Sequence, residues 1–245
     1  ALHAHNAAGL MSFANAPLDI KVNGQRALRL DASLGFSPNL IGGASVNRVV
    51  PGVMGATIGG GGSSSPGFEA TNRVEANYGT ISGGIANTIQ SGSRNSTIGG
   101  GDGNTIQEDS GWSTIGGGES NFIEQNARYS VVAGGGLNRA RGYGGVIGGG
   151  SLNTIQTNAE HASIGGGLRN WIAANAMFST IGGGNANTNS REYATIAGGD
   201  LNRTAGFYAT VGGGRRNTGS GGFAKAGGGD RQADTERTVE VRRGS

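Results

Sequence analysis

Along most of the chain, one aliphatic residue recurs at a nearly constant spacing, just before a glycine-rich stretch. Successive copies of this anchor residue are 15 or 17 residues apart, with one exception of 23 residues. A fixed internal period is the sequence signature of a repeat architecture, and here it predicts 12 coils. The anchors are Ile41, Ile58, Ile81, Ile98, Ile115, Val132, Ile147, Ile164, Ile181, Ile196 and Val211, with Ala226 as a degenerate twelfth.

An asparagine stands six residues after most anchors. After Ile58 that position holds Ser64, but Asn72 lies nine residues before the next anchor, as the asparagines of 15-residue units do. Residues 63–70 are therefore interpreted as an insertion, and only Gln232 is expected to break the column. Stacked amide side chains can hydrogen-bond from unit to unit. The predicted structural ladder comprises Asn47, Asn72, Asn87, Asn104, Asn121, Asn138, Asn153, Asn170, Asn187, Asn202 and Asn217.

Within each unit, residues alternate with a period of two, which is typical of strands. The segment "STIGG" places serine and isoleucine on one face and threonine on the other. A second short strand follows in "NTIQ", where asparagine and isoleucine share a face. Glycine and β-branched residues at the recurring positions disfavour a helix. The repeat therefore predicts an all-β fold, a parallel β-solenoid whose coils stack into a rod of roughly 50–60 Å.

The interior of each coil is expected to be small. Besides the anchors, it should hold second-strand isoleucines and small residues two places before the anchors: Ile89, Ile106, Ile123, Ile155, Ile172, Ser96, Ser113, Ser130, Ser179, Ala194 and Ala209. Ordering each residue costs about 1–2 kcal/mol, which so little apolar area hardly offsets. We therefore expect a second buried surface between copies of the chain, as in a homotrimer.

The outer face of the first strands is the candidate for that second surface. A threonine column there is broken at Val131 and Val146. Beside it runs a column of mostly aromatic residues three places before the anchors. This column comprises Tyr78, Trp112, Tyr129, His161, Phe178, Tyr193, Tyr208 and Phe223.

The N-terminal region predicts a β-hairpin at residues 17–31, with its turn at Asn23-Gly24. A three-residue loop, residues 23–25, would pair Ile20 with Leu28 and Leu18 with Leu30 and set Asp19 opposite Arg29. The expected organisation is an N-terminal segment with this cap (1–40), the repeat domain (41–232) and a charged tail or connector (233–245).

Composition narrows the class of protein. Glycine supplies 52 of the 245 residues, but the net charge of only +3 argues against disorder. The absence of cysteine excludes disulfides and thiolate metal sites. No apolar run is long enough to span a membrane, so direct membrane insertion is not expected. Basic residues beyond Leu201 are not interleaved with a recognisable nucleic-acid module, so nucleic acid is not an expected partner.

Candidate chemistry is sparse. The stretch "STIGGGDGNTIQ" has the glycines of a phosphate loop, but it recurs along the chain, with neither a helix nor the P-loop lysine after it. The calcium nonapeptide needs a period of nine, and aspartate occupies the position only at Asp102, Asp200 and Asp230. His3, His5 and His161 form no triad with serine and aspartate. The sequence predicts no catalytic residue, metal or cofactor; a polysaccharide-acting β-helix enzyme and an ice-binding threonine face remain minor alternatives.

Binding is expected where the repeat is interrupted or aromatic. The insertion carries Pro66 and Phe68, and Trp112 and Tyr129 lie on adjacent coils. These aromatic residues, with His161 and Phe178 on the same column, could stack on sugars or pack between copies. Packing between copies is the favoured interpretation.

Several segments carry a family resemblance. "VNGQRALRL" (22–30), "SPNLIGG" (37–43), "GVMGATIGGGG" (52–62) and the serial "STIGGGxxN" units resemble the β-roll heads of trimeric autotransporter adhesins, the YadA-like haemagglutinin family. The resemblance implies a left-handed β-roll, an intertwined homotrimer and a place on the bacterial cell surface. It also implies an extracellular adhesive or fibrous role toward a host or cell-surface glycan or matrix protein. Similar arrays occur in fibre proteins, so the alternative is a receptor-binding tail-fibre segment of a phage or contractile injection system.

Overall fold

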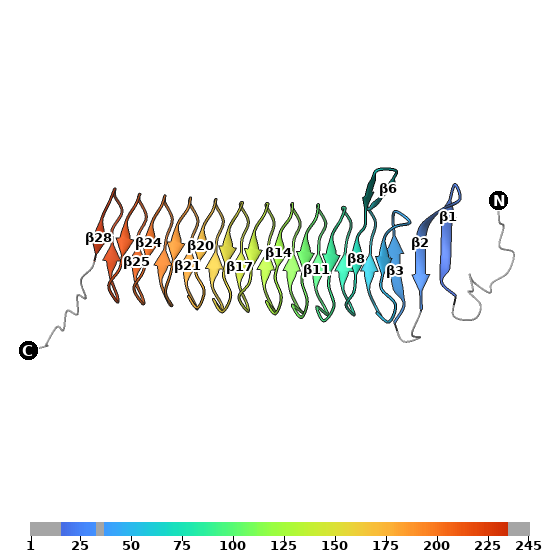
Figure 1. The fold of residues 1–245 in the computed structure, drawn as a ribbon, viewed down its shortest axis with the longest axis horizontal. Helices are drawn as coiled ribbons and strands as arrows, with labels where there is room; N and C mark the ends of the chain where they lie inside the picture. Colours follow the sequence, from blue (N-terminus) through green and yellow to red (C-terminus); the bar gives the residue numbers. More distant parts are fainter. Residues whose placement is uncertain (1–15, 33–36, 235–245) are drawn as a thin grey trace, which may run out of the picture.

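The computed structural model describes residues 16–32 and 37–234, which form a parallel β-solenoid of about 11 turns. The coils stack side by side into a straight rod, with the N-terminal hairpin at one end (Figure 1). The described residues contain strands and turns but no helix, and hence no helix that could span a membrane.

The first of the two long faces is a sheet of 14 strands, 12 of which belong to the solenoid because β1 and β2 form the hairpin. Each coil contributes its anchor strand to this face. The strands are β3 (Asn39–Gly42), β5 (Thr57–Ile58), β9 (Thr80–Ile81), β11 (Thr97–Ile98), β13 (Thr114–Ile115), β15 (Val131–Val132), β17 (Val146–Ile147), β19 (Ser163–Ile164), β21 (Thr180–Ile181), β23 (Thr195–Ile196), β25 (Thr210–Val211) and β27 (Lys225–Ala226).

The second face is a sheet of 12 strands built from the second strand of each coil. A turn of the solenoid leads from one strand to the next strand on the same face, so 12 strands are connected by 11 turns. The structure therefore has about 11 complete turns, where the 12 anchors predicted 12 coils. The strands are β4 (Arg48–Val49), β8 (Arg73–Val74), β10 (Thr88–Ile89), β12 (Thr105–Ile106), β14 (Phe122–Ile123), β16 (Arg139–Ala140), β18 (Thr154–Ile155), β20 (Trp171–Ile172), β22 (Thr188–Asn189), β24 (Arg203–Thr204), β26 (Thr218–Gly219) and β28 (Ala233–Asp234).

The register places like residues above one another. Ile98 pairs with Ile81 on one side and Ile115 on the other, and the second sheet repeats this with its own isoleucines. The predicted interior is confirmed, because every anchor from Ile58 to Val211 and every predicted second-strand isoleucine is fully buried. The predicted small residues at the position two before the anchors are also fully buried.

Two features of the interior were not predicted. The 17-residue coils bury a further small residue in the corner between their two strands: Ser93, Ser110, Ala127, Ala159 and Ala176. Toward the C-terminus the core also becomes polar. Asn189 replaces isoleucine and its Nδ2 donates to the carbonyl oxygens of Thr180 and Ala194, at 2.8 and 3.0 Å. Thr204 Oγ1 donates to Asn189 Oδ1 at 2.6 Å, so these buried polar atoms are paired rather than costly.

Close approach between coils explains the glycine that stands three residues after each anchor from Ile58 to Val211. Gly101 has a φ of +88°, and a Cβ built there would overlap the carbonyl oxygen of Gly118 in the next coil. Only glycine fits both the left-handed backbone and this contact.

The hairpin joins β1 (Leu18–Val22) to β2 (Gln25–Asp31). The predicted pairs Leu18–Leu30, Asp19–Arg29 and Ile20–Leu28 are confirmed, but the three-residue loop is wrong. A two-residue turn at Asn23-Gly24, both with positive φ, is followed by a bulge that absorbs the extra residue.

This hairpin covers the first coil. Strand β2 runs antiparallel to β3, so the exposed edge of the first face is paired. Asp19 and Arg29 form an ion pair at 2.7 Å, and Arg26 Nη2 donates to the carbonyl oxygens of Ser45 (2.9 Å) and Asn47 (2.6 Å). The hydrogen bond from Arg29 holds the pKa of Asp19 below its usual value.

The structure also shows the form of the insertion and the position at which the solenoid ends. Residues 63–70 form a second hairpin, β6 (Ser63–Ser65) with β7 (Phe68–Ala70), which projects from the rod (Figure 1). At the C-terminus β28 extends the solenoid to Asp234, two residues past the predicted boundary. The charged segment 235–245, His3 and His5 lie outside the described residues.

Candidate functional site

A ladder of buried asparagines runs the length of the rod. The backbone N–H of Asn104 donates to Oδ1 of Asn87 at 3.0 Å, while its Nδ2 donates to the carbonyl oxygens of Gly100 and Gly118 at 2.9 Å. Oδ1 of Asn104 in turn accepts the backbone N–H of Asn121 at 3.0 Å. Each amide thus links its own coil to the one before and the one after.

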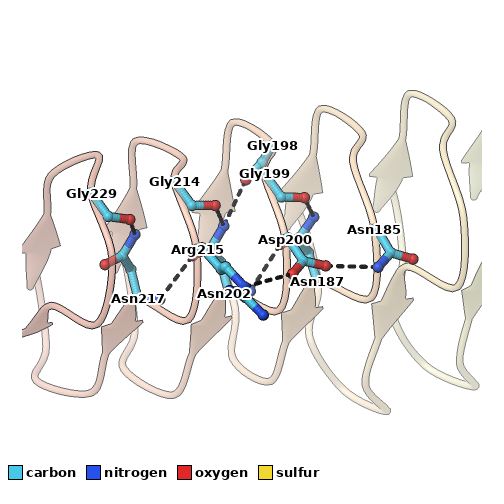
Figure 2. A network of polar contacts seen from close by, with 10 residues as sticks. All are labelled: Asn185, Asn187, Gly198, Gly199, Asp200, Asn202, Gly214, Arg215, Asn217 and Gly229. Carbon is cyan, nitrogen blue, oxygen red and sulfur yellow. Dashed lines mark hydrogen bonds and ion pairs between the residues drawn. The ribbon is translucent and has the colours of Figure 1, made fainter.

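All 11 predicted asparagines occupy this column, each with at most 1% of its surface exposed. Asn72 takes the displaced rung despite the insertion: its N–H donates to Oδ1 of Asn47, and its own Oδ1 accepts the N–H of Asn87. Gln232 was expected to break the column, but its backbone N–H still donates to Oδ1 of Asn217 at 2.7 Å, so the backbone part of the ladder continues there. Figure 2 shows the last rungs, Asn187, Asn202 and Asn217, with the glycine carbonyls that they bind.

A smaller polar network lies outside the ladder on the same corner. Asp200 accepts a hydrogen bond from Asn185 Nδ2 at 2.7 Å and pairs with Arg215 at 3.3 Å (Figure 2). These contacts are exposed and contribute little to stability. Within the described ranges no group of three or more histidine, cysteine or acidic side chains is placed to hold a metal ion.

A second ladder, of aromatic rings, runs along another corner and is here called the aromatic ladder. Neighbouring ring centroids lie 4.7 to 5.5 Å apart without a gap, within the range of favourable ring packing. Each ring is exposed at the surface. Its members are Trp112, Tyr129, Tyr143, His161, Phe178, Tyr193, Tyr208 and Phe223.

Seven of these eight rings belong to the predicted column, and the structure brings them together. The residue at this position adopts a left-handed backbone, with a φ of 59° at Trp112 and 60° at Tyr129. Sequence reasoning missed Tyr143, which lies four residues before its anchor rather than three. Gly144 takes the left-handed position in that coil, and the ring comes from the preceding residue.

Tyr78, the remaining member of the predicted column, is separated from the ladder. Asn95 occupies the position between Tyr78 and Trp112, and Tyr78 lies against Gly55 on its other side. The aromatic ladder therefore begins at Trp112.

Most neighbouring rings of the aromatic ladder stack face to face, and the stacked faces cover one another. One face of Trp112 stacks on Tyr129, with centroids 5.4 Å apart and planes 9° apart. The guanidinium of Arg94 covers the other face at 4.7 Å. Both faces of Trp112 are therefore covered, an arrangement that favours packing between copies over sugar stacking, the two predicted uses of this pair. What remains is a long, narrow, partly exposed apolar stripe of the kind that marks interaction surfaces.

The insertion is a separate surface. Pro66 and Phe68 lie on the projecting hairpin and are exposed, Phe68 by 59%. Among the described residues, no ring contact joins Phe68 to the aromatic ladder. The structure therefore does not unite the two predicted binding regions.

The sequence matches no protein-family model and no curated protein.

Proposed function

We propose that this chain is a non-enzymatic, extracellular structural or adhesive element, a left-handed β-roll that assembles as a homotrimer in a bacterial surface adhesin or fibre. The resemblance of the "STIGGGxxN" units to adhesin heads supports the handedness, the location and the bacterial surface role. A rod of similar stacked coils supports a fibrous role, because its surface features recur along its length and so can match those of another rod over a long distance.

The aromatic ladder is the observation that carries the proposal. The interior of the rod is already closed by its own isoleucines and asparagines, so the eight rings are not needed to fill the core. The rings nevertheless form a continuous, exposed aromatic line from Trp112 to Phe223. A straight apolar stripe is best buried against an equally straight one, which a parallel copy of the same chain supplies.

Substitution within the aromatic ladder tests the assembly. Tyr193→Asn together with Tyr208→Asn removes two neighbouring rings and keeps the left-handed backbone accessible, because asparagine already occupies this position at Asn95. We expect the double variant to dissociate at a protein concentration at least tenfold higher than the wild type, as measured by sedimentation velocity.

Trp171→Ser is the matched control. Trp171 is also an exposed aromatic residue, at 42%, but it lies on the second sheet, away from the aromatic ladder. The control should associate as the wild type does. Equal weakening by both changes would show that the assembly does not use the aromatic ladder.

A further inference from the structure

A groove opens at one corner of the N-terminal coils, just before the aromatic ladder begins. It encloses about 530 Å³, within the usual range for small-ligand sites, and corner residues of five successive coils line it. Its origin is visible in the spacing. Six residues separate Val74 from the anchor Ile81, whereas eight separate the corresponding residues in the coils on either side. The short corner leaves a notch between two longer ones.

The only other short corner between two long ones is filled. That corner leads to Ile147, and Tyr143 projects from it to contact both Tyr129 and His161. In the N-terminal notch the equivalent position, four residues before the anchor, is Asn77. Its Oδ1 accepts the backbone N–H of Met54 at 3.1 Å, so this position holds a hydrogen-bonded amide instead of a ring.

The groove carries two guanidinium groups that lack a carboxylate partner within the described part of the chain. Arg94 lies over the indole of Trp112, and Arg128 Nε donates to the backbone carbonyl of Asp109 at 3.1 Å. Neither arginine takes part in an ion pair among the described residues. Both are exposed, so their remaining N–H groups are available to a ligand.

Hydrogen-bond acceptors and an apolar wall accompany these cations. The carboxylate of Asp109 lies against Gly92 and forms no ion pair in the described ranges. Glu75, also in the groove, is paired with Arg73 at 2.8 Å. The opposite side is the turn at residues 50–53, which contributes two valines and a proline.

We propose that this groove binds a saccharide that carries a carboxylate group. A sugar carboxylate would pair with the guanidinium groups of Arg94 and Arg128. Its hydroxyls would donate to Asp109 and Glu75, and its C–H surface would lie against the apolar turn. An acidic peptide or a nucleic acid fits less well, because its repeated negative charges would face both carboxylates. This inference rests on the proposed adhesive function and assigns it a ligand class.

Trp112 allows a direct binding measurement. The chain has two tryptophans, so Trp171→Phe leaves Trp112 as the only one, on the wall of the groove. Sialyllactose and methyl glucuronide, each with a single carboxylate, are titrated while Trp112 fluorescence is recorded, with lactose as the neutral control. We expect saturable binding of at least one acidic sugar and at least tenfold weaker binding of lactose.

Arginine variants in the same background locate the site. Arg94→Gln and Arg128→Gln should each weaken binding about tenfold or more, because each removes a charge-assisted hydrogen bond. Since Arg94→Gln also alters the surroundings of the indole, isothermal titration calorimetry supplies a second readout for every variant. Arg216→Gln, an exposed arginine on a C-terminal coil, should bind as the wild type does.

Three results would overturn the proposal: no binding of either acidic sugar up to about 10 mM, equal binding of lactose, or unchanged binding by both groove variants. Unchanged thermal unfolding of the variants shows that a lost signal is not a lost fold. The oligomeric state is measured in parallel by sedimentation. A trimer without sugar binding refutes the groove assignment alone, whereas sugar binding by a monomer refutes the assembly alone.

Discussion

The backbone N–H of Asn121 donates to the side-chain oxygen of Asn104, one coil earlier, at 3.0 Å. The Nδ2 group of Asn121 also donates to Oδ1 of Asn104, to the carbonyl oxygen of Gly117 in its own coil and to that of Gly135 in the next coil. A single fully buried side chain therefore has hydrogen-bond partners in three coils. A buried polar group left without its partner costs about 1–3 kcal/mol, so this column should dominate the response of the rod to substitution.

Replacing Asn121 with leucine should lower the free energy of unfolding by about 3 kcal/mol or more, because several buried donors and acceptors lose their partners together. Urea denaturation followed by circular dichroism measures the change. Glu108→Ala, on an exposed corner, should alter stability by less than about 0.5 kcal/mol. Equal losses of stability from the two substitutions would show that the hydrogen bonds of the asparagine ladder do not stabilise the rod.

The glycine column gives a second prediction. Gly101→Ala places a Cβ against the carbonyl oxygen of Gly118 and forces alanine into a backbone with a φ of +88°. We expect a loss of about 2 kcal/mol or more in unfolding free energy. Gly83→Ala, where a Cβ meets nothing within 4 Å, is the control and should be close to neutral. If the Gly101→Ala protein were as stable as the control, the two coils could move apart to accommodate a Cβ without losing free energy of unfolding, and the close-contact explanation would be wrong.

Tyr143 should stabilise the middle of the aromatic ladder, since its ring contacts both neighbours edge-on. Tyr143→Ser is expected to cost about 1–2 kcal/mol, the sum of two ring contacts. Thermal unfolding compared with Phe68→Ser, on the projecting hairpin, provides the measurement. The Phe68 variant should unfold at the wild-type temperature, and a larger drop there than at Tyr143 would contradict the assignment.

The cap hairpin should loosen in acid. Because Arg29 holds the pKa of Asp19 below its usual value of 3.8, the folded state binds this proton less readily than the unfolded state. The stabilisation is therefore present above pH 3.8 and is lost as the pH falls through the lower pKa of the folded state. Amide hydrogen exchange in residues 18–31 should lose protection over that range, more steeply in the wild type than in Asp19→Asn. Identical pH profiles would show that the pair does not hold the cap.

Most of the fold can be predicted from the sequence because nearly every coil carries the same pattern of anchor, glycine and asparagine positions. The anchor spacing determines which residues stack, and the asparagine column fixes the register even across the insertion, as Asn72 shows. A period-two pattern on each short strand then decides which side chains face inward. These relations are local, and each one recurs in about a dozen coils of the same sequence, so the pattern can be recognised from the sequence alone.

The features that escaped prediction depend on single positions. The hairpin turn has two residues rather than three because Asn23 and Gly24 both adopt positive φ and a bulge restores the pairing beyond them. Tyr143 was missed because Gly144 takes its backbone position. The groove depends partly on the lengths of the corners, which the 15- and 17-residue spacings reveal. It also depends on which side chain fills each notch, and the spacings do not reveal that.

The mass of the wild-type protein in dilute solution tests the central claim, assembly of the rods through the aromatic ladder, most directly. One chain has a mass of 24.4 kDa, so a homotrimer has three times that, about 73 kDa. Sedimentation equilibrium at micromolar concentration should give the trimer mass. A stable monomer of about 24 kDa that does not associate as its concentration rises would contradict the account.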